Sequence, residues 1–136
     1  MPQPPVVTFT VFHFRPRRRA WAFAQMGLAR PLLRGVPGLR FWKMMGAGRG
    51  LGFTIRPDWG RYALLAVWND TSSMKIFFSD SQFIRRYRHA SDHLCTLTLQ
   101  PLTTHGSWDG HTPFLPALNH KPEPHQPIAV LTRATI

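Results

Sequence analysis

Two hydrophobic periods alternate along the first hundred residues of this chain and divide them into strands and helices. Residues 6–14 read VVTFTVFHF, in which Thr8 and Thr10 alternate with β-branched and aromatic side chains. A period of two residues is typical of a strand that has two unequal faces. The pattern therefore predicts an opening strand over these residues, followed by a basic loop over residues 15–19 that contains Pro16.

The second segment has the period of a helix that begins near Ala20. Its apolar residues recur at i, i+3, i+7 and i+11, which is the spacing of one helix face: Trp21, Ala24, Leu28 and Leu32. Because proline lacks the N–H that an α-helix needs and clashes with the preceding turn, we expect Pro31 to end or kink this helix near Arg30.

Two further apolar runs predict strands over residues 39–45 and 62–68, which read LRFWKMM and YALLAVW. Glycines at positions 46, 48, 50 and 52 predict a flexible loop between them. After the second run we expect a helix with Asp70 or Thr71 as its N-cap, and residues 79–81 should restart it. Residues 94–99 are the expected fourth strand.

The resulting order, β-α-β-β-α-β over roughly residues 6–108, is the ferredoxin-like split βαβ pattern. The predicted fold class is therefore α+β, of the dimeric α/β-barrel type, with four antiparallel strands and both helices on one face of the sheet. The other face would be bare. We expect a second sheet, a dimer partner or a ligand to cover it, because bare apolar faces seldom remain exposed.

The end of the chain predicts a linker and the beginning of a second unit. Residues 109–127 contain five prolines and three histidines, a composition that is typical of a linker. Residues 128–136 then read IAVLTRATI, a β-rich run that is similar to the opening strand. The expected organisation is a domain over residues 1–108, a linker over 109–127, and the first strand of an incomplete second unit over 128–136.

Composition narrows the possible chemistry. The formal net charge is +11, with 17 Lys and Arg against six acids, so an anionic partner is expected unless the arginines only reflect a GC-rich genome. One cysteine, Cys95, excludes an intrachain disulfide and a Cys-rich zinc site. No apolar run approaches the ~20 residues of a membrane span, and no signal peptide is evident. We expect a cytoplasmic protein that at most lies on the inner membrane.

The candidate catalytic motifs are few. The glycine loop does not fit a dinucleotide site, because a strand rather than a helix follows it; a loop over a pocket and a plain hairpin loop are the alternatives. Six acids make carboxylate-driven hydrolysis a poor candidate. Redox or transfer chemistry would therefore come from a cofactor, for which the protein supplies the pocket.

Several segments, in order along nearly the whole chain, resemble spheroidene monooxygenases. They are residues 21–27 (WAFAQMG), 37–43 (PGLRFWK), 46–48 (GAG), 52–54 (GFT), 62–68 (YALLAVW), 85–88 (RRYR), 106–108 (GSW) and 129–136 (AVLTRATI). The chain is similar to the N-terminal half of that family plus the first strand of the second half. Two departures are Pro31 and the segment at residues 94–96, where the family tends to carry a tryptophan.

This resemblance implies an oxygen-dependent ketolase of acyclic carotenoids that contains haem and uses O2 as co-substrate. It also implies an electron donor such as a ferredoxin and two ferredoxin-like halves in a longer chain. Whether a chain that stops after one strand of the second half is active stays open. The resemblance transfers no iron ligand to a named position, and the ligand could lie in the missing half.

The residues nevertheless offer candidates for such a site. His13, His89 and His93 could ligate iron through a neutral imidazole nitrogen. Arg15, with the other arginines of its loop, could bind haem propionates or lipid phosphates. A channel for a long polyene could be lined by Phe41, Trp42, Met45 and Phe53. Each set also has an alternative without a ligand. The histidines and the arginine loop could simply be solvated, and the apolar side chains could belong to the core.

Two other classes of function stay open. One is a non-catalytic module that forms a homodimer through its bare sheet face. The other is an RNA-binding domain, which the basic charge and the four-stranded sheet both suggest. RNA is the less favoured partner, because the run at residues 62–68 is largely aliphatic and offers few stacking platforms.

Overall fold

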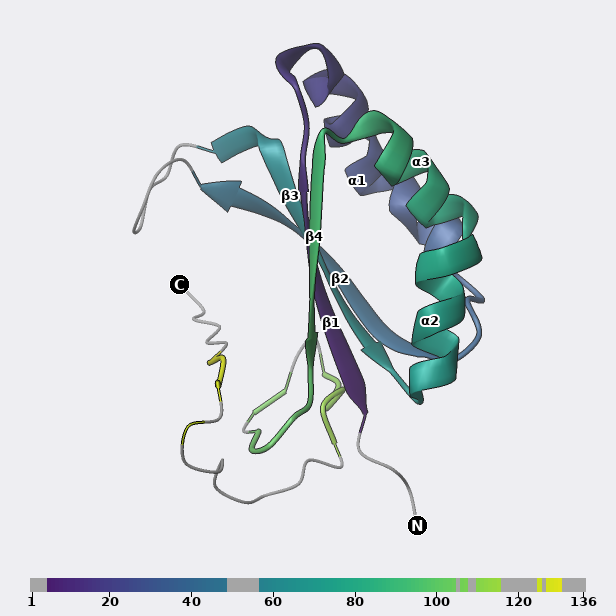
Figure 1. Ribbon diagram of the computed structural model, residues 1–136, viewed down its shortest axis with the longest axis vertical. Coiled ribbons are helices and arrows are strands. Elements are labelled where there is room, and N and C mark those ends of the chain that lie inside the picture. The colour runs from purple at the N-terminus through teal and green to yellow at the C-terminus, as the bar shows by residue number, and fades with distance from the viewer. Residues whose placement is uncertain are drawn as a thin grey trace.

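The computed structural model describes residues 5–48, 57–104, 106–107, 110–115, 125 and 127–130. Four antiparallel strands form one sheet, and the helices lie together on one side of it (Figure 1). The elements follow the predicted order: β1 (Val6–His13), a short 3₁₀ helix (Pro16–Arg18), α1 (Arg19–Leu33), β2 (Leu39–Gly48), β3 (Pro57–Trp68), α2 (Thr71–Asp80), α3 (Gln82–Ala90) and β4 (His93–Leu99). The ferredoxin-like α+β fold is confirmed.

The strand order is β2-β3-β1-β4, so β1 and β3 are central while β2 and β4 form the edges. In β1, Thr8 is paired with Ala66 of β3 and Thr98 of β4, and His13 with Arg61 and His93. Because successive side chains of a strand point to opposite faces, this register places each row of paired residues on one side of the sheet. We call the side opposite the helices the open face; on β1 it carries Val7, Phe9, Val11 and His13.

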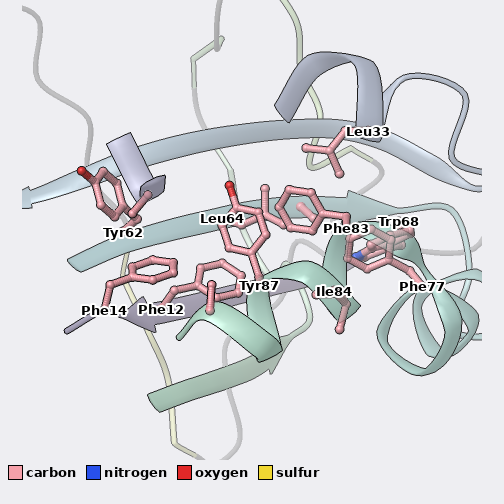
Figure 2. Close-up of a cluster of buried hydrophobic side chains, with 13 residues drawn as sticks. Phe12, Phe14, Leu33, Tyr62, Leu64, Trp68, Phe77, Phe83, Ile84 and Tyr87 are labelled. Atoms are coloured by element: carbon pink, nitrogen blue, oxygen red, sulfur yellow. The ribbon is translucent and has the colours of Figure 1, made fainter. Parts of the chain in front are cut away.

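The main core lies between the sheet and the helices. Phe12 of β1 is fully buried, with its ring centroid 4.7 Å from that of Tyr87 and 6.4 Å from that of Phe83, both on α3 (Figure 2). Two threonines of β1 point into this core. Thr8 Oγ1 accepts a hydrogen bond of 3.0 Å from Trp68 Nε1, so its burial leaves no unpaired hydroxyl.

The open face is only partly bare, which corrects the expectation of an uncovered sheet. Val7, Leu65 and Val67 are buried there, and Phe114 from the segment at residues 110–115 packs against them. Arg40 anchors this segment, because its guanidinium donates to the backbone oxygen of Leu115. A stretch that the sequence predicted to be linker therefore covers one end of the sheet.

Three predicted boundaries move by three or more residues. Pro31 lies inside α1, which continues to Leu33. Burial of Leu33, which is 2% exposed, opposes the loss of one backbone hydrogen bond. Gly46 and Gly48 belong to β2, and β3 begins at Pro57, so both strands extend into the predicted glycine loop. The rest of that loop lies outside the described residues.

The predicted second unit is not tested. Residues 127–130 are in neither a helix nor a strand, and residues 131–136 lie outside the described part of the chain. The linker boundaries and the strand over residues 128–136 therefore stay predictions.

The predicted starts of α2 and α3 are confirmed. Asp70 caps α2, because its carboxylate accepts a hydrogen bond of 2.7 Å from the backbone N–H of Ser73; this bond holds the pKa of Asp70 below its usual value. Ser81 ends α2 and caps α3, and its hydroxyl accepts a bond of 3.1 Å from the N–H of Ile84.

We expect Ser81→Ala to lower the free energy of unfolding by about 1 kcal/mol, because the capped N–H loses its partner. Urea denaturation followed by circular dichroism measures the loss. Ser72→Ala, an exposed substitution in the first turn of α2, is the matched control and should change stability by less than half as much. Equal losses in the two variants would contradict the capping role.

Candidate functional site

His13 lies at the end of β1, on the open face, between two other cationic or titratable side chains. Its register partners are Arg61 on β3 and His93 on β4. Partners on adjacent strands point to the same side of a sheet, so the three side chains form a row across one end of this face. The centroids of the two imidazole rings are 6.0 Å apart.

Asp92 holds the His13 side chain through a direct hydrogen bond. The distance from His13 Nδ1 to Asp92 Oδ1 is 2.8 Å, and the backbone N–H of Asp92 donates to the backbone oxygen of His13 at 2.9 Å. The side-chain bond from His13 lowers the pKa of Asp92. Arg15 approaches the same carboxylate, with its Nε 4.0 Å from Oδ2.

The three candidate iron ligands do not gather at one place. His13 and His93 are neighbours, whereas His89 is exposed on α3, in the helix layer. α3 ends at Ala90, and this confirms that His89 and His93 do not share a helix face. Among the described residues, no group of three or more His, Cys, Asp or Glu side chains is arranged to hold a metal ion.

The predicted substrate residues are divided by the alternation of β2. Phe41 and Met45 lie on the open face and pack against the buried cluster of Val7, Leu65 and Val67. Trp42 packs into the helix-side core. Phe53 lies outside the described residues. Phe41 also borders an open cavity of about 190 Å³, lined by Arg40, Phe41, His111, Thr112 and Pro113.

Two contributors to this face were missed by sequence reasoning. Asp92 is 79 residues from His13, and only the strand register brings the two together. Phe114 lies in a segment with no strand or helix period. In the sequence, the pair Ser91-Asp92 before an apolar run indicates the end of a helix. It gives no indication that Asp92 is the partner of His13.

The whole chain is similar in sequence to three known proteins. It is 38% identical to the spheroidene monooxygenase of Cereibacter sphaeroides over 96% of its own length, 36% identical to that of Rhodobacter capsulatus over 97%, and 30% identical to that of Rubrivivax gelatinosus over 96%. The chain is a sequence relative of the spheroidene monooxygenases. It spans 40%, 55% and 50% of the lengths of these three proteins. No protein-family model matches it.

Solved structures agree on the fold. A Pseudomonas aeruginosa protein superimposes with a TM-score of 0.58 at 11% identity, covering 76% of this chain and 99% of its own. A candidate antibiotic biosynthesis monooxygenase of Bordetella bronchiseptica gives 0.56 at 18%, covering 74% and 100%. At such low identity these likenesses carry the fold alone. The relationship to the spheroidene monooxygenases rests on sequence, and it confirms the resemblance seen in the motifs.

Within the described part of this spheroidene monooxygenase relative, no helix is long and apolar enough to cross a membrane.

Proposed function

We propose that this chain is the first α+β unit of a haem-dependent monooxygenase that oxidises an acyclic carotenoid to a ketone. The observation that carries the proposal is the similarity to three spheroidene monooxygenases over at least 96% of this chain. The ferredoxin-like fold is compatible with it.

The proposed reaction inserts one oxygen atom of O2 into a C–H bond and releases the other as water, which consumes two electrons and two protons. A second turnover at the same carbon gives a geminal diol, and loss of water from the diol leaves the ketone. Haem supplies the activation of O2 when it is bound. The protein supplies the iron ligand, the orientation of the substrate and the exclusion of water.

The row at the end of the open face has the donors that a haem requires. His13 would hold the iron through an imidazole nitrogen, and Arg15 and Arg61 would bind carboxylates such as propionates through charge-assisted hydrogen bonds. Val11 and Ala63 lie on the same face one step along their strands and would provide apolar surface against a porphyrin. The described sheet would form one wall of such a pocket.

The substrate would lie along the apolar part of the open face. The part of this surface that Phe114 does not cover runs along β1 from Phe9 to His13, roughly 13 Å at the rise of a β-strand. Phe41 and Met45 of β2 lie on the same face. The direction of the strand leads a long apolar chain toward His13. Trp42 is assigned to the core instead, because it faces the helices.

We further propose that a second α+β unit covers this face and completes the pocket. The three relatives are about twice as long as this chain, and Leu97 on the open side of β4 is 54% exposed. Burying this face would remove apolar surface from water. Electrons would come from a donor such as a ferredoxin, and the net charge of +11 favours an acidic one.

Product analysis under labelled oxygen tests the function. The chain is expressed in a host that accumulates spheroidene, alone and fused to the C-terminal half of the Cereibacter sphaeroides relative. We expect the fusion to yield a ketone that carries one ¹⁸O atom from ¹⁸O2, whereas the chain alone should give at most a trace. The carotenoids are extracted quickly, because a ketone can exchange its oxygen with water.

The two alternative functions, a non-catalytic module and an RNA-binding domain, predict different results for the chain alone and the fusion. An unlabelled carotenoid pool from both proteins, together with a stable homodimer of the chain alone, would favour the non-catalytic module. Salt-dependent RNA binding with a steep slope against salt concentration would favour the RNA-binding domain.

A further inference from the structure

We infer that Asp92 is a positioning residue for His13, which it holds in the one tautomer that offers Nε2 to a ligand on the open face. The inference deepens the haem-dependent function proposed above and rests on it for the identity of that ligand. The hydrogen bond itself can be tested without any cofactor.

The geometry determines which ring nitrogen carries the proton. An ionised carboxylate can only accept a hydrogen bond, and Asp92 Oδ1 lies 2.8 Å from His13 Nδ1. Nδ1 must therefore be the donor, so the lone pair of the neutral ring resides on Nε2. Metal-ligating histidines commonly have this arrangement, in which a carboxylate fixes the ring and raises its basicity.

The carboxylate is itself held in place. Asp92 lies between α3 and β4, and its backbone N–H donates to the His13 backbone oxygen at 2.9 Å. The side chain of Asp92 is 21% exposed while that of His13 is 41% exposed. The imidazole therefore remains accessible to a ligand.

The other two histidines lack this support. Within the described ranges, no carboxylate is hydrogen-bonded to the ring of His93 or His89. His89 is exposed in the helix layer, away from the open face. His13 is therefore the ligand that the geometry selects from the three candidates, and His93 is a neighbour that can contact the bound group.

The apo protein provides the first test. Long-range ¹H–¹⁵N NMR at a pH of about 8, above the ordinary histidine pKa of about 6.5, reports the tautomer of each ring. We expect Nδ1–H for His13 in the 136-residue chain, and a shift toward Nε2–H in Asp92→Ala. Asp80→Ala removes an exposed acid elsewhere, on α2, and should leave the His13 tautomer unchanged.

Either of two results would overturn the inference: Nε2–H for His13 in the wild type, or an unchanged tautomer in Asp92→Ala. Circular dichroism of each variant confirms that the chain is folded, so that a lost signal is not mistaken for a changed tautomer.

Hemin titration provides the second test. We expect a Soret band in the wild type that is lost in His13→Ala and retained in His89→Ala and His93→Ala. Asp92→Ala should weaken hemin binding about tenfold to a hundredfold and raise the reduction potential of the iron, because a less basic imidazole stabilises the ferric state less. Asp80→Ala should change neither quantity.

The two tests distinguish a failure of the positioning role of Asp92 from a failure of the proposed haem-dependent function. The titration and its variants use the fused two-unit protein, in which the proposed pocket is complete. Absence of a specific Soret band from that protein contradicts the haem-dependent function, and the tautomer then decides the role of Asp92 alone. A band that disappears in His93→Ala but persists in His13→Ala overturns the selection of His13.

Discussion

Replacing Phe12 with alanine is expected to remove about 3–5 kcal/mol from the free energy of unfolding, the usual cost of truncating a buried aromatic ring. Phe12 is fully buried at the centre of the helix-side core, and its ring contacts those of Phe14, Phe83 and Tyr87. Domains of this kind have about 5–15 kcal/mol of stability in total. The variant should therefore lose a large part of its stability.

Phe9→Ala is the matched control for this prediction. Phe9 lies on the same strand but faces the open side, where it is only partly buried, so its truncation should cost less than half as much. Urea denaturation followed by tryptophan fluorescence measures both losses. A larger loss in Phe9→Ala than in Phe12→Ala would mean that the helix-side cluster is not the main core.

Gly38→Ala is expected to be the second most damaging of the substitutions considered. Gly38 has a φ of +78°, and a Cβ there would lie 2.2 Å from Ser73 Oγ and 2.3 Å from Ser73 Cβ. The left-handed conformation costs about 1–2 kcal/mol for an L-residue, and the overlap adds about 1–3 kcal/mol. The collision involves the first turn of α2, so relief requires that helix or the loop before β2 to move.

Gly35→Ala isolates the contribution of the overlap. Gly35 has a φ of +79°, but a Cβ there meets nothing within 4 Å, so only the conformational cost applies. The difference between the two unfolding free energies measures the collision. Adding Ser73→Gly to Gly38→Ala should recover part of the loss beyond additivity. Equal losses at the two glycines would contradict the predicted contact.

Most of the fold could be predicted from local pattern. A period of two residues marked β1, and side chains that pair with the first backbone N–H groups marked the starts of α2 and α3. Pro31 was misleading, because the helix continues past it to Leu33, whose burial opposes the local cost of the proline. The cover over the open face could not be predicted, because Phe114 lies in a segment without periodicity and packs against residues that are far from it in sequence.

The candidate site was predictable only in its parts. His13 could be placed at the end of a strand, but its bond to Asp92 depends on the antiparallel register between β1 and β4. Strand alternation could have separated Trp42 from Phe41 and Met45, since a residue and its neighbour in sequence face opposite sides of a sheet. The nature of the substrate has no signature in local pattern and enters only through similarity to whole proteins.

The most direct test of the proposed function is oxygen incorporation by the fused two-unit protein and by its His13→Ala variant, in spheroidene-accumulating cells supplied with ¹⁸O2. A ketone with one ¹⁸O atom in the fusion, and its loss in the variant at equal protein level, is the predicted result. Unlabelled carotenoid from the folded fusion, or labelled ketone at an equal rate from the variant, would contradict it.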